Sequence, residues 1–219
     1  MSEPYFSPDT LDADGCPTWL NVLAGEESDP NHLVHAVRDL GPADALEMLG
    51  VDPAEIRPAE LPARPPGDLT SLARAAIHPL NPTVVLIAGR VGDWTFIYDD
   101  LGETGWQWPV KGQSPCNTTE GLSRAGKIAV TSGIAITGQA YLTYAADGTI
   151  LLLSGDPVFR AADLGEDAPA DLRAAVDAAG TFGAEVDFGL GMRTICALAG
   201  LPRTLDQLRQ LPLLLAALD

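Results

Sequence analysis

The sequence predicts an α+β fold with a mainly antiparallel sheet, a short N-terminal helix and a helical C-terminal segment. Runs rich in Val, Ile, Thr and aromatic residues fill the middle of the chain. Turn signals at Gly89–Asp93 and at Asp147-Gly148 join neighbouring runs as hairpins. Apolar residues recur at helical spacing in the last third. Strands that come first and helices that come last are typical of α+β proteins rather than of a βαβ repeat.

The N-terminal residues 1–16 are acidic and polar, and we expect them to be flexible and to precede one domain over residues 17–219. A chain of this length can bury one sizeable core. The next run, PTWLNVL at 17–23, has strand-like content. The run NHLVHAVRDL at 31–40 is ambiguous, because Leu33, Val37 and Leu40 also lie at helical spacing.

A short helix is predicted directly after Gly41-Pro42. Pro42 suits a first helical turn, and an apolar face precedes the stop at Gly50. The following segment, 52–67, holds five prolines, which rule out regular structure over most of it. We therefore expect a surface connection within the domain.

The stretch GDWTFIYDDLGETGW, at 92–106, combines two tryptophans with four acids. In a strand, Trp94, Phe96 and Tyr98 fall on one face, and such an aromatic row favours core packing. The acids and glycines that follow are typical of a turn, namely Asp99, Asp100, Gly102 and Gly105.

The second half of the chain is predicted to begin with a short helix around 118–126, capped by Thr118 or Thr119 and ended by Gly126. A β block follows over 127–156. Helical spacing then covers about 168–219, in segments 168–182, 187–201 and 204–211 with Thr204 as a cap. Pro212 separates these from a final short helix, LLLAALD at 213–219.

The formal charge is −17, and the chain holds only two lysines, Lys111 and Lys127. Because phosphate contacts need clustered Lys and Arg, direct binding to nucleic acid is not expected. Residues 1–68 carry 14 acids and three arginines, a net charge of −11. This acidity either opposes aggregation or steers a basic protein partner.

Three cysteines, Cys16, Cys116 and Cys196, lie far apart and form no CxxC pair. This spacing favours a reducing cytoplasm over a disulfide framework. The N-terminus lacks the basic start and apolar run of a signal peptide, and no run of about 18 apolar residues occurs. We therefore expect a cytoplasmic protein that does not associate with a membrane.

Common catalytic signatures are missing from the sequence, including GxxxxGK[ST], GxSxG, HExxH and GxGxxG before a helix. The run Asp12–Gly15 is similar to part of a calcium loop, but Thr10 and Asn21 occupy two of the ligand positions. His32 and His35, three positions apart, would lie on opposite faces of a strand or near each other on a helix, and we expect ordinary histidines rather than a metal site. We predict no catalytic residue, no metal and no cofactor.

Four segments together resemble a family of actinobacterial proteins of unknown function: 32–53, 84–105, 121–134 and 140–157. In that family a TPEExLxxLG-type helix precedes a strand with a GGWT-like turn, and a DG hairpin follows. Asp93 stands here where that pattern often has a second glycine. The resemblance spans roughly residues 30–215; it implies a fold and no transferable catalytic residue. Low Lys with high Ala, Arg and Pro agrees with a GC-rich genome.

Two functions stay open at this stage. The first is a non-catalytic interaction module for a basic protein partner, of the immunity type that buries the active surface of a toxin. The alternative is an enzyme or small-molecule binder with a cleft near Trp94 and Trp108. The candidate binding residues are Trp94, Tyr98, Asp99, Trp106 and Trp108. A deep pocket with convergent polar groups favours the second function, and a broad acidic or aromatic patch favours the first. The sequence names neither the partner nor the oligomeric state.

Overall fold

The computed structural model describes residues 4–25, 31–65, 71–80, 82–105, 108–113, 116–135, 137–155, 157–183 and 186–218. Within these ranges the strands are β1 His32–Arg38, β2 Arg57–Ala59, β3 Val84–Val91, β4 Trp94–Asp99, β5 Ile128–Ile134, β6 Ala140–Ala146, β7 Thr149–Ser154 and β8 Leu213–Leu218. The α-helices are α1 Thr18–Ala24, α2 Pro42–Met48, α3 Leu72–Ile77, α4 Thr118–Ser123, α5 Ala170–Ala179, α6 Leu190–Ala199 and α7 Leu205–Arg209. Short 3-10 helices lie at Pro8–Thr10, Pro53–Glu55 and Ala161–Asp163.

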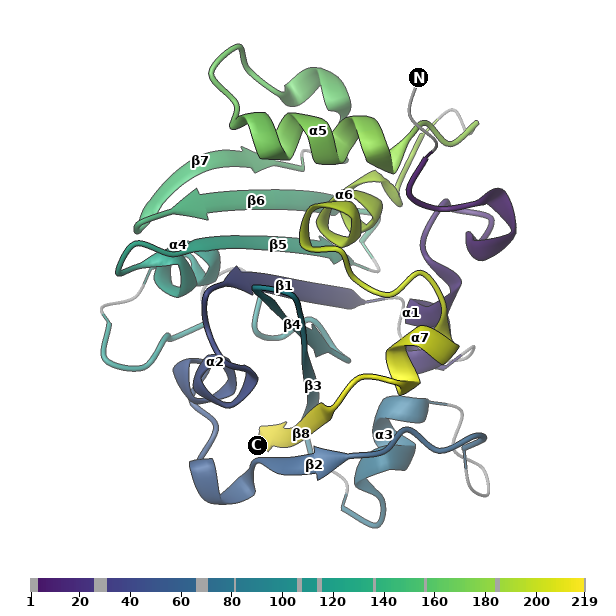
Figure 1. The fold of residues 1–219 in the computed structure, drawn as a ribbon, viewed down its shortest axis with the longest axis vertical. Helices are drawn as coiled ribbons and strands as arrows, with labels where there is room; N and C mark the ends of the chain where they lie inside the picture. Colours follow the sequence, from purple (N-terminus) through teal and green to yellow (C-terminus); the bar gives the residue numbers. More distant parts are fainter. Residues whose placement is uncertain are drawn as a thin grey trace.

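The described strands form one eight-stranded antiparallel sheet in the order β2-β8-β3-β4-β1-β5-β6-β7. The predicted α+β class is therefore confirmed, with a short helix at the N-terminal side and helices at the C-terminal side. The sheet is strongly twisted, so that β5, β6 and β7 run across the view of Figure 1 while β3 runs nearly vertically. None of the described helices is both long enough and apolar enough to cross a bilayer.

Helices cover both faces of the sheet. One hydrophobic cluster joins alternate strand residues to side chains of α1, α3, α5, α6 and α7, and a second joins the opposite face to α2 and α4. Figure 1 shows α2 and α4 on one side of the sheet and α1, α6 and α7 on the other. Because both faces are covered, successive residues of β4 are all buried, although the row Trp94, Phe96 and Tyr98 lies on one face as predicted.

Two elements correct the sequence-based expectations. The run at 17–23, predicted as strand-like, forms helix α1, because Trp19, Leu20 and Leu23 fall on one helical face and pack into the first cluster. The last segment, predicted as a helix, is strand β8, which lies between β2 and β3. Leu and Ala favour helices in isolation, but pairing with β3 satisfies the backbone and sends Leu213 and Leu215 into the core.

Smaller corrections concern caps and the proline-rich segment. The side chain that caps α4 belongs to Asn117, which accepts from Thr119 N at 2.9 Å, rather than to either threonine. The connection over 52–67 contains strand β2, which pairs with β8 at one edge of the sheet. Near the start of the chain, Phe6 is buried in the first cluster, so part of the segment predicted to be flexible packs on the domain.

Arg193 ties the start of the chain to the C-terminal helices. Its guanidinium donates to both carboxylate oxygens of Asp187, at 3.0 and 2.6 Å. The remaining N–H groups donate to the carbonyls of Gly15, Ala179 and Gly180. All five guanidinium donors therefore have partners, which allows Arg193 to be buried with only 1 % of its surface exposed.

Candidate functional site

A row of four residues crosses the sheet on the α2 and α4 side. Leu33 lies opposite Asp99 on β4 and opposite Gly133 on β5, and Gly133 lies opposite Tyr141 on β6. Directly opposite residues of antiparallel strands share a face, so their side chains lie next to one another. This row forms the floor of the candidate site.

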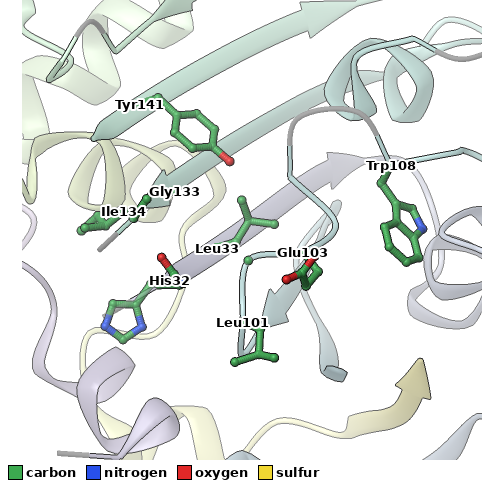
Figure 2. A pocket seen from close by; sticks show the side chains of 11 residues that line it. His32, Leu33, Leu101, Glu103, Trp108, Gly133, Ile134 and Tyr141 are labelled. Carbon is green, nitrogen blue, oxygen red and sulfur yellow. The ribbon is translucent and has the colours of Figure 1, made fainter. Parts of the chain in front are cut away.

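Tyr141 can lie over the sheet because two residues next to its ring, Gly133 and Gly105, have no side chain. A Cβ added to Gly133 would lie 2.6 Å from the Tyr141 ring, and one added to Gly105 would lie 2.7 Å from the Tyr141 hydroxyl. Both glycines are therefore required by close approach rather than by a turn. Figure 2 shows the Tyr141 hydroxyl pointing toward the space beside Leu33. Burial, and then the charge of Asp99, raises the pKa of Tyr141 above its ordinary value, so the hydroxyl keeps its proton.

Asp99 holds the loop that follows β4. Its Oδ1 accepts from the backbone N–H of Leu101 and of Gly102, and its Oδ2 accepts from both the backbone N–H and the hydroxyl of Thr104, at 2.7–3.0 Å. These four bonds fix the loop and present Glu103 at the cleft. The turn chemistry that the sequence predicts for Asp99 is therefore present.

A chain of buried hydrogen bonds runs beneath this loop. Because the Thr104 hydroxyl donates to Asp99, its oxygen accepts from His35 Nε2, at 3.0 Å. Nδ1 of the neutral ring then accepts from the Thr131 hydroxyl at 2.8 Å, and Thr131 accepts from Thr119 at 2.7 Å. Burial lowers the pKa of His35 to about 3, which keeps the ring neutral.

Trp108 forms the wall of the site toward α2 and α4. Its indole Nε1 donates to the carbonyl of Leu49 at 2.6 Å, and its backbone N–H donates to the Thr118 hydroxyl at 3.0 Å. The first bond anchors the end of α2 and the second reaches the first residue of α4. The indole ring therefore has a fixed orientation beside the cavity.

These elements enclose a cleft of about 440 Å³. Figure 2 shows the Glu103 carboxylate and the Tyr141 hydroxyl directed toward the space between them, whereas the His32 ring points away from Tyr141. A volume of this size is within the range of small-molecule sites. The lining residues are Asn31, His32, Leu33, Leu101, Gly102, Glu103, Trp108, Gly133, Ile134, Ala135 and Tyr141.

The structure separates the residues that the sequence groups as one binding site. Trp94 and Tyr98 pack into the first hydrophobic cluster, on the sheet face opposite to Trp108. Asp99 lies beneath the cleft and is fully buried, and Trp108 lines it. Trp106 falls outside the described residues. Since alternation along β4 sends Tyr98 and Asp99 to opposite faces, one cleft cannot contain both side chains.

Sequence reasoning missed Tyr141, Glu103 and His35. Tyr141 gave one signal, because its partner Gly133 lies within a strand in which four of the seven residues are β-branched, and a glycine within a strand often marks close approach. His35 and Thr131 lie 96 residues apart, and Glu103 reads as an ordinary turn acid. Only their pairing in the sheet brings these residues together.

Within the described ranges, no group of three or more His, Cys, Asp or Glu side chains is placed to hold a metal ion. His32 and His35 lie on opposite faces of β1. Comparisons with protein-family models, curated protein sequences and solved structures find no significant match. The resemblance to an actinobacterial family therefore stays a prediction.

Proposed function

We propose that this protein is a non-catalytic interaction module that binds a basic protein partner and takes one positively charged side chain of that partner into the cleft. The observation that carries the proposal is the chemistry of the lining. It combines the exposed Glu103 carboxylate with the aromatic rings of Trp108 and Tyr141, and the described lining residues include no Lys or Arg. A carboxylate beside aromatic faces attracts an ammonium or guanidinium group.

The bonding of nearby groups supports a non-catalytic role. Both ring nitrogens of His35 are bonded to threonines inside the protein, and the carboxylate of Asp99 is bonded to Leu101, Gly102 and Thr104 of the following loop. The raised pKa of Tyr141 makes its hydroxyl a weaker acid than an ordinary tyrosine, so it keeps its proton. A general acid or base has to reach the substrate proton, and neither His35 nor Asp99 is free to do so.

The charge of the whole chain supports a basic partner. A net charge of −17 attracts positively charged proteins at long range and speeds their association. In this proposal the protein acts in the cytoplasm in an immunity-like manner, by covering the active surface of a basic toxin. The spacing of the three cysteines, without a CxxC pair, supports a reducing compartment.

Calorimetric titration with the probe peptide acetyl-Ala-Arg-Ala-amide tests the cleft directly. We expect weak binding, on the order of millimolar, because one charged group supplies few contacts. Glu103→Gln should lower the affinity about fivefold, since removing one charge-assisted bond costs about 1 kcal/mol. The control is Glu55→Gln, an exposed acid near β2, which should leave affinity unchanged. Equal binding of acetyl-Ala-Glu-Ala-amide, or no effect of Glu103→Gln, would contradict the proposal.

A second candidate function is binding of a small cationic metabolite, and the cleft volume of about 440 Å³ favours it. Of the two tryptophans that the sequence suggests for such a cleft, Trp108 lines it and Trp94 does not. Agmatine, a small guanidinium compound, distinguishes the two functions. Binding of agmatine at least tenfold tighter than the peptide would favour the metabolite, because a peptide-binding cleft gains from the flanking backbone.

A further inference from the structure

A second cavity, of about 300 Å³, lies next to the cleft. The loop before α1, α1 itself, the ends of β1 and β5, and the segment before α6 all contribute to it. The lining residues are Asp12, Asp14, Cys16, Asn21, His32, Ile134 and Phe188. Neither the sequence-based site nor the proposed function uses this cavity.

The cleft and the second cavity share two lining residues, His32 and Ile134. These residues lie opposite each other in the pairing of β1 with β5, at the ends of both strands. The two spaces therefore meet at the end of the sheet, one on each side of this pair. For the design of probe peptides, the distance between the centres of the two spaces is taken as on the order of 10 Å, the spacing of packed layers.

The loop that lines the second cavity is held by Asp12. Its Oδ1 accepts from the backbone N–H of Asp14 at 2.9 Å and of Cys16 at 2.8 Å, and its Oδ2 accepts from Asn21 Nδ2 at 2.6 Å. This bonding orders the loop and leaves the exposed Asp14 carboxylate at the cavity.

Among the described residues, no Lys or Arg forms an ion pair with Asp12 or Asp14 at this cavity. Its described lining contains no Lys or Arg. The nearby Arg193 donates to the Gly15 carbonyl, and its ion pair is with Asp187. Burial is the main cause that raises the pKa of the Cys16 thiol; the charges of Asp12 and Asp14 add to it, and that of Arg193 opposes them.

We infer that the second cavity is a subsite for a second positively charged side chain of the same partner, so that the recognised segment is an extended, dibasic peptide. This inference rests on the proposed function, because the first basic residue occupies the cleft. An extended chain spans at most about 3.3–3.6 Å per residue, so two basic residues about three positions apart bridge the two spaces. Linking the two contacts in one chain strengthens binding without new chemistry.

Titration with three probe peptides tests the subsite. One peptide contains a single arginine, one contains Arg-Ala-Ala-Arg, and one separates its two arginines by eight alanines. We expect Arg-Ala-Ala-Arg to bind about tenfold tighter than the single-arginine peptide. We expect a smaller gain from the long spacer, because effective concentration falls with linker length.

Asp14→Asn should abolish the dibasic gain, which is the tighter binding of Arg-Ala-Ala-Arg relative to the single-arginine peptide. The affinity for the single-arginine peptide should be unchanged. The matched control is Asp9→Asn, an exposed acid of the same N-terminal segment that does not line the cavity. Circular dichroism of each variant checks the fold. A dibasic gain that survives Asp14→Asn, or no gain at all, overturns the subsite but not the proposed function. If Glu103→Gln leaves the affinity for the single-arginine peptide unchanged, the proposed function is overturned, and this inference with it.

Discussion

His35 Nε2 donates to the hydroxyl of Thr104 over 3.0 Å, and this bond joins strand β1 to the loop that carries Glu103. The ring is fully buried, with Thr131 on its other nitrogen. A protonated ring could not accept from Thr131, so the site depends on a neutral imidazole. The buried chain therefore positions the cleft and contributes a pH dependence to folding.

We predict that this pH dependence is visible in the free energy of unfolding. The pKa of His35 is about 3 in the folded chain against 6.5 for a free side chain, so the unfolded state binds more protons between these values. The contribution of His35 to the free energy of unfolding is therefore fully present above pH 6.5. It is lost as pH decreases toward 3, by up to roughly 4–5 kcal/mol. Denaturation across this range should show the fall in the wild type and not in His35→Gln. His78→Gln, at an exposed position, should retain it.

Asp100 should make the free energy of unfolding depend on pH in the opposite direction to His35. Its Oδ1 accepts from Val85 N and its Oδ2 pairs with Arg74, both at 2.7 Å, yet burial raises its pKa to about 6 from 3.8. The folded state then binds more protons than the unfolded state, so this contribution decreases as pH rises from about 4 to 6, by about 3 kcal/mol. Subtracting the Asp100→Asn denaturation curve from the wild type should isolate this slope. A difference that is flat between pH 4 and 6 would show that Asp100 titrates normally.

The ion pair of Arg193 with Asp187 should be among the most sensitive contacts of the fold. Asp187→Asn keeps the shape but leaves a buried guanidinium without its counter-charge, and we expect a loss of about 3–5 kcal/mol. The control is Asp206→Asn, because Asp206 pairs with Arg209 while 88 % of its side chain is exposed. That change should alter stability by less than about 1 kcal/mol. Equal effects in urea denaturation would argue against a structural role for Arg193.

Trp94 is predicted to be a packing residue. Its side chain joins the first hydrophobic cluster, with 7 % of the residue exposed. Trp94→Ala should destabilise the protein by about 3–5 kcal/mol, whereas Leu80→Ala, at a residue 53 % exposed, should stay within about 0.5 kcal/mol. Calorimetric titration of the single-arginine peptide, at a temperature where the variant is folded, should give wild-type affinity. A large loss of affinity would place Trp94 in the binding site instead.

Gly133 should control the shape of the cleft. A methyl group at this position would lie 2.6 Å from the Tyr141 ring, so Gly133→Ala has to displace that ring and its hydroxyl. We expect weaker binding of the single-arginine peptide, by about fivefold or more, if one directed contact is lost. Gly165→Ala meets no atom within 4 Å and should change neither affinity nor stability. Wild-type affinity in Gly133→Ala would mean that Tyr141 does not contact the ligand.

The local order of the sequence was sufficient to predict several elements. Pro42 before an apolar face, the Asp147-Gly148 turn, and alternation along Trp94–Asp99 each act over a few residues, and the structure contains α2, the β6–β7 hairpin and β4 at these places. The acidic turn after β4 was predictable for the same reason. The Asp99 carboxylate accepts four hydrogen bonds from residues two to five positions further on.

Contacts between distant segments decided the rest. Leu213–Leu218 has the composition of a helix, yet it forms a strand because its backbone pairs with β3. Local propensity contains no information on this distant partner. The cleft likewise depends on register: pairing of β1 with β4 and β5 brings Leu33, Asp99 and Gly133 into one row, and β6 adds Tyr141. A shift of one residue would send these side chains to the opposite face. Sequence alone therefore determined several strands and turns, whereas tertiary pairing decided strand β8 and which residues line the candidate site.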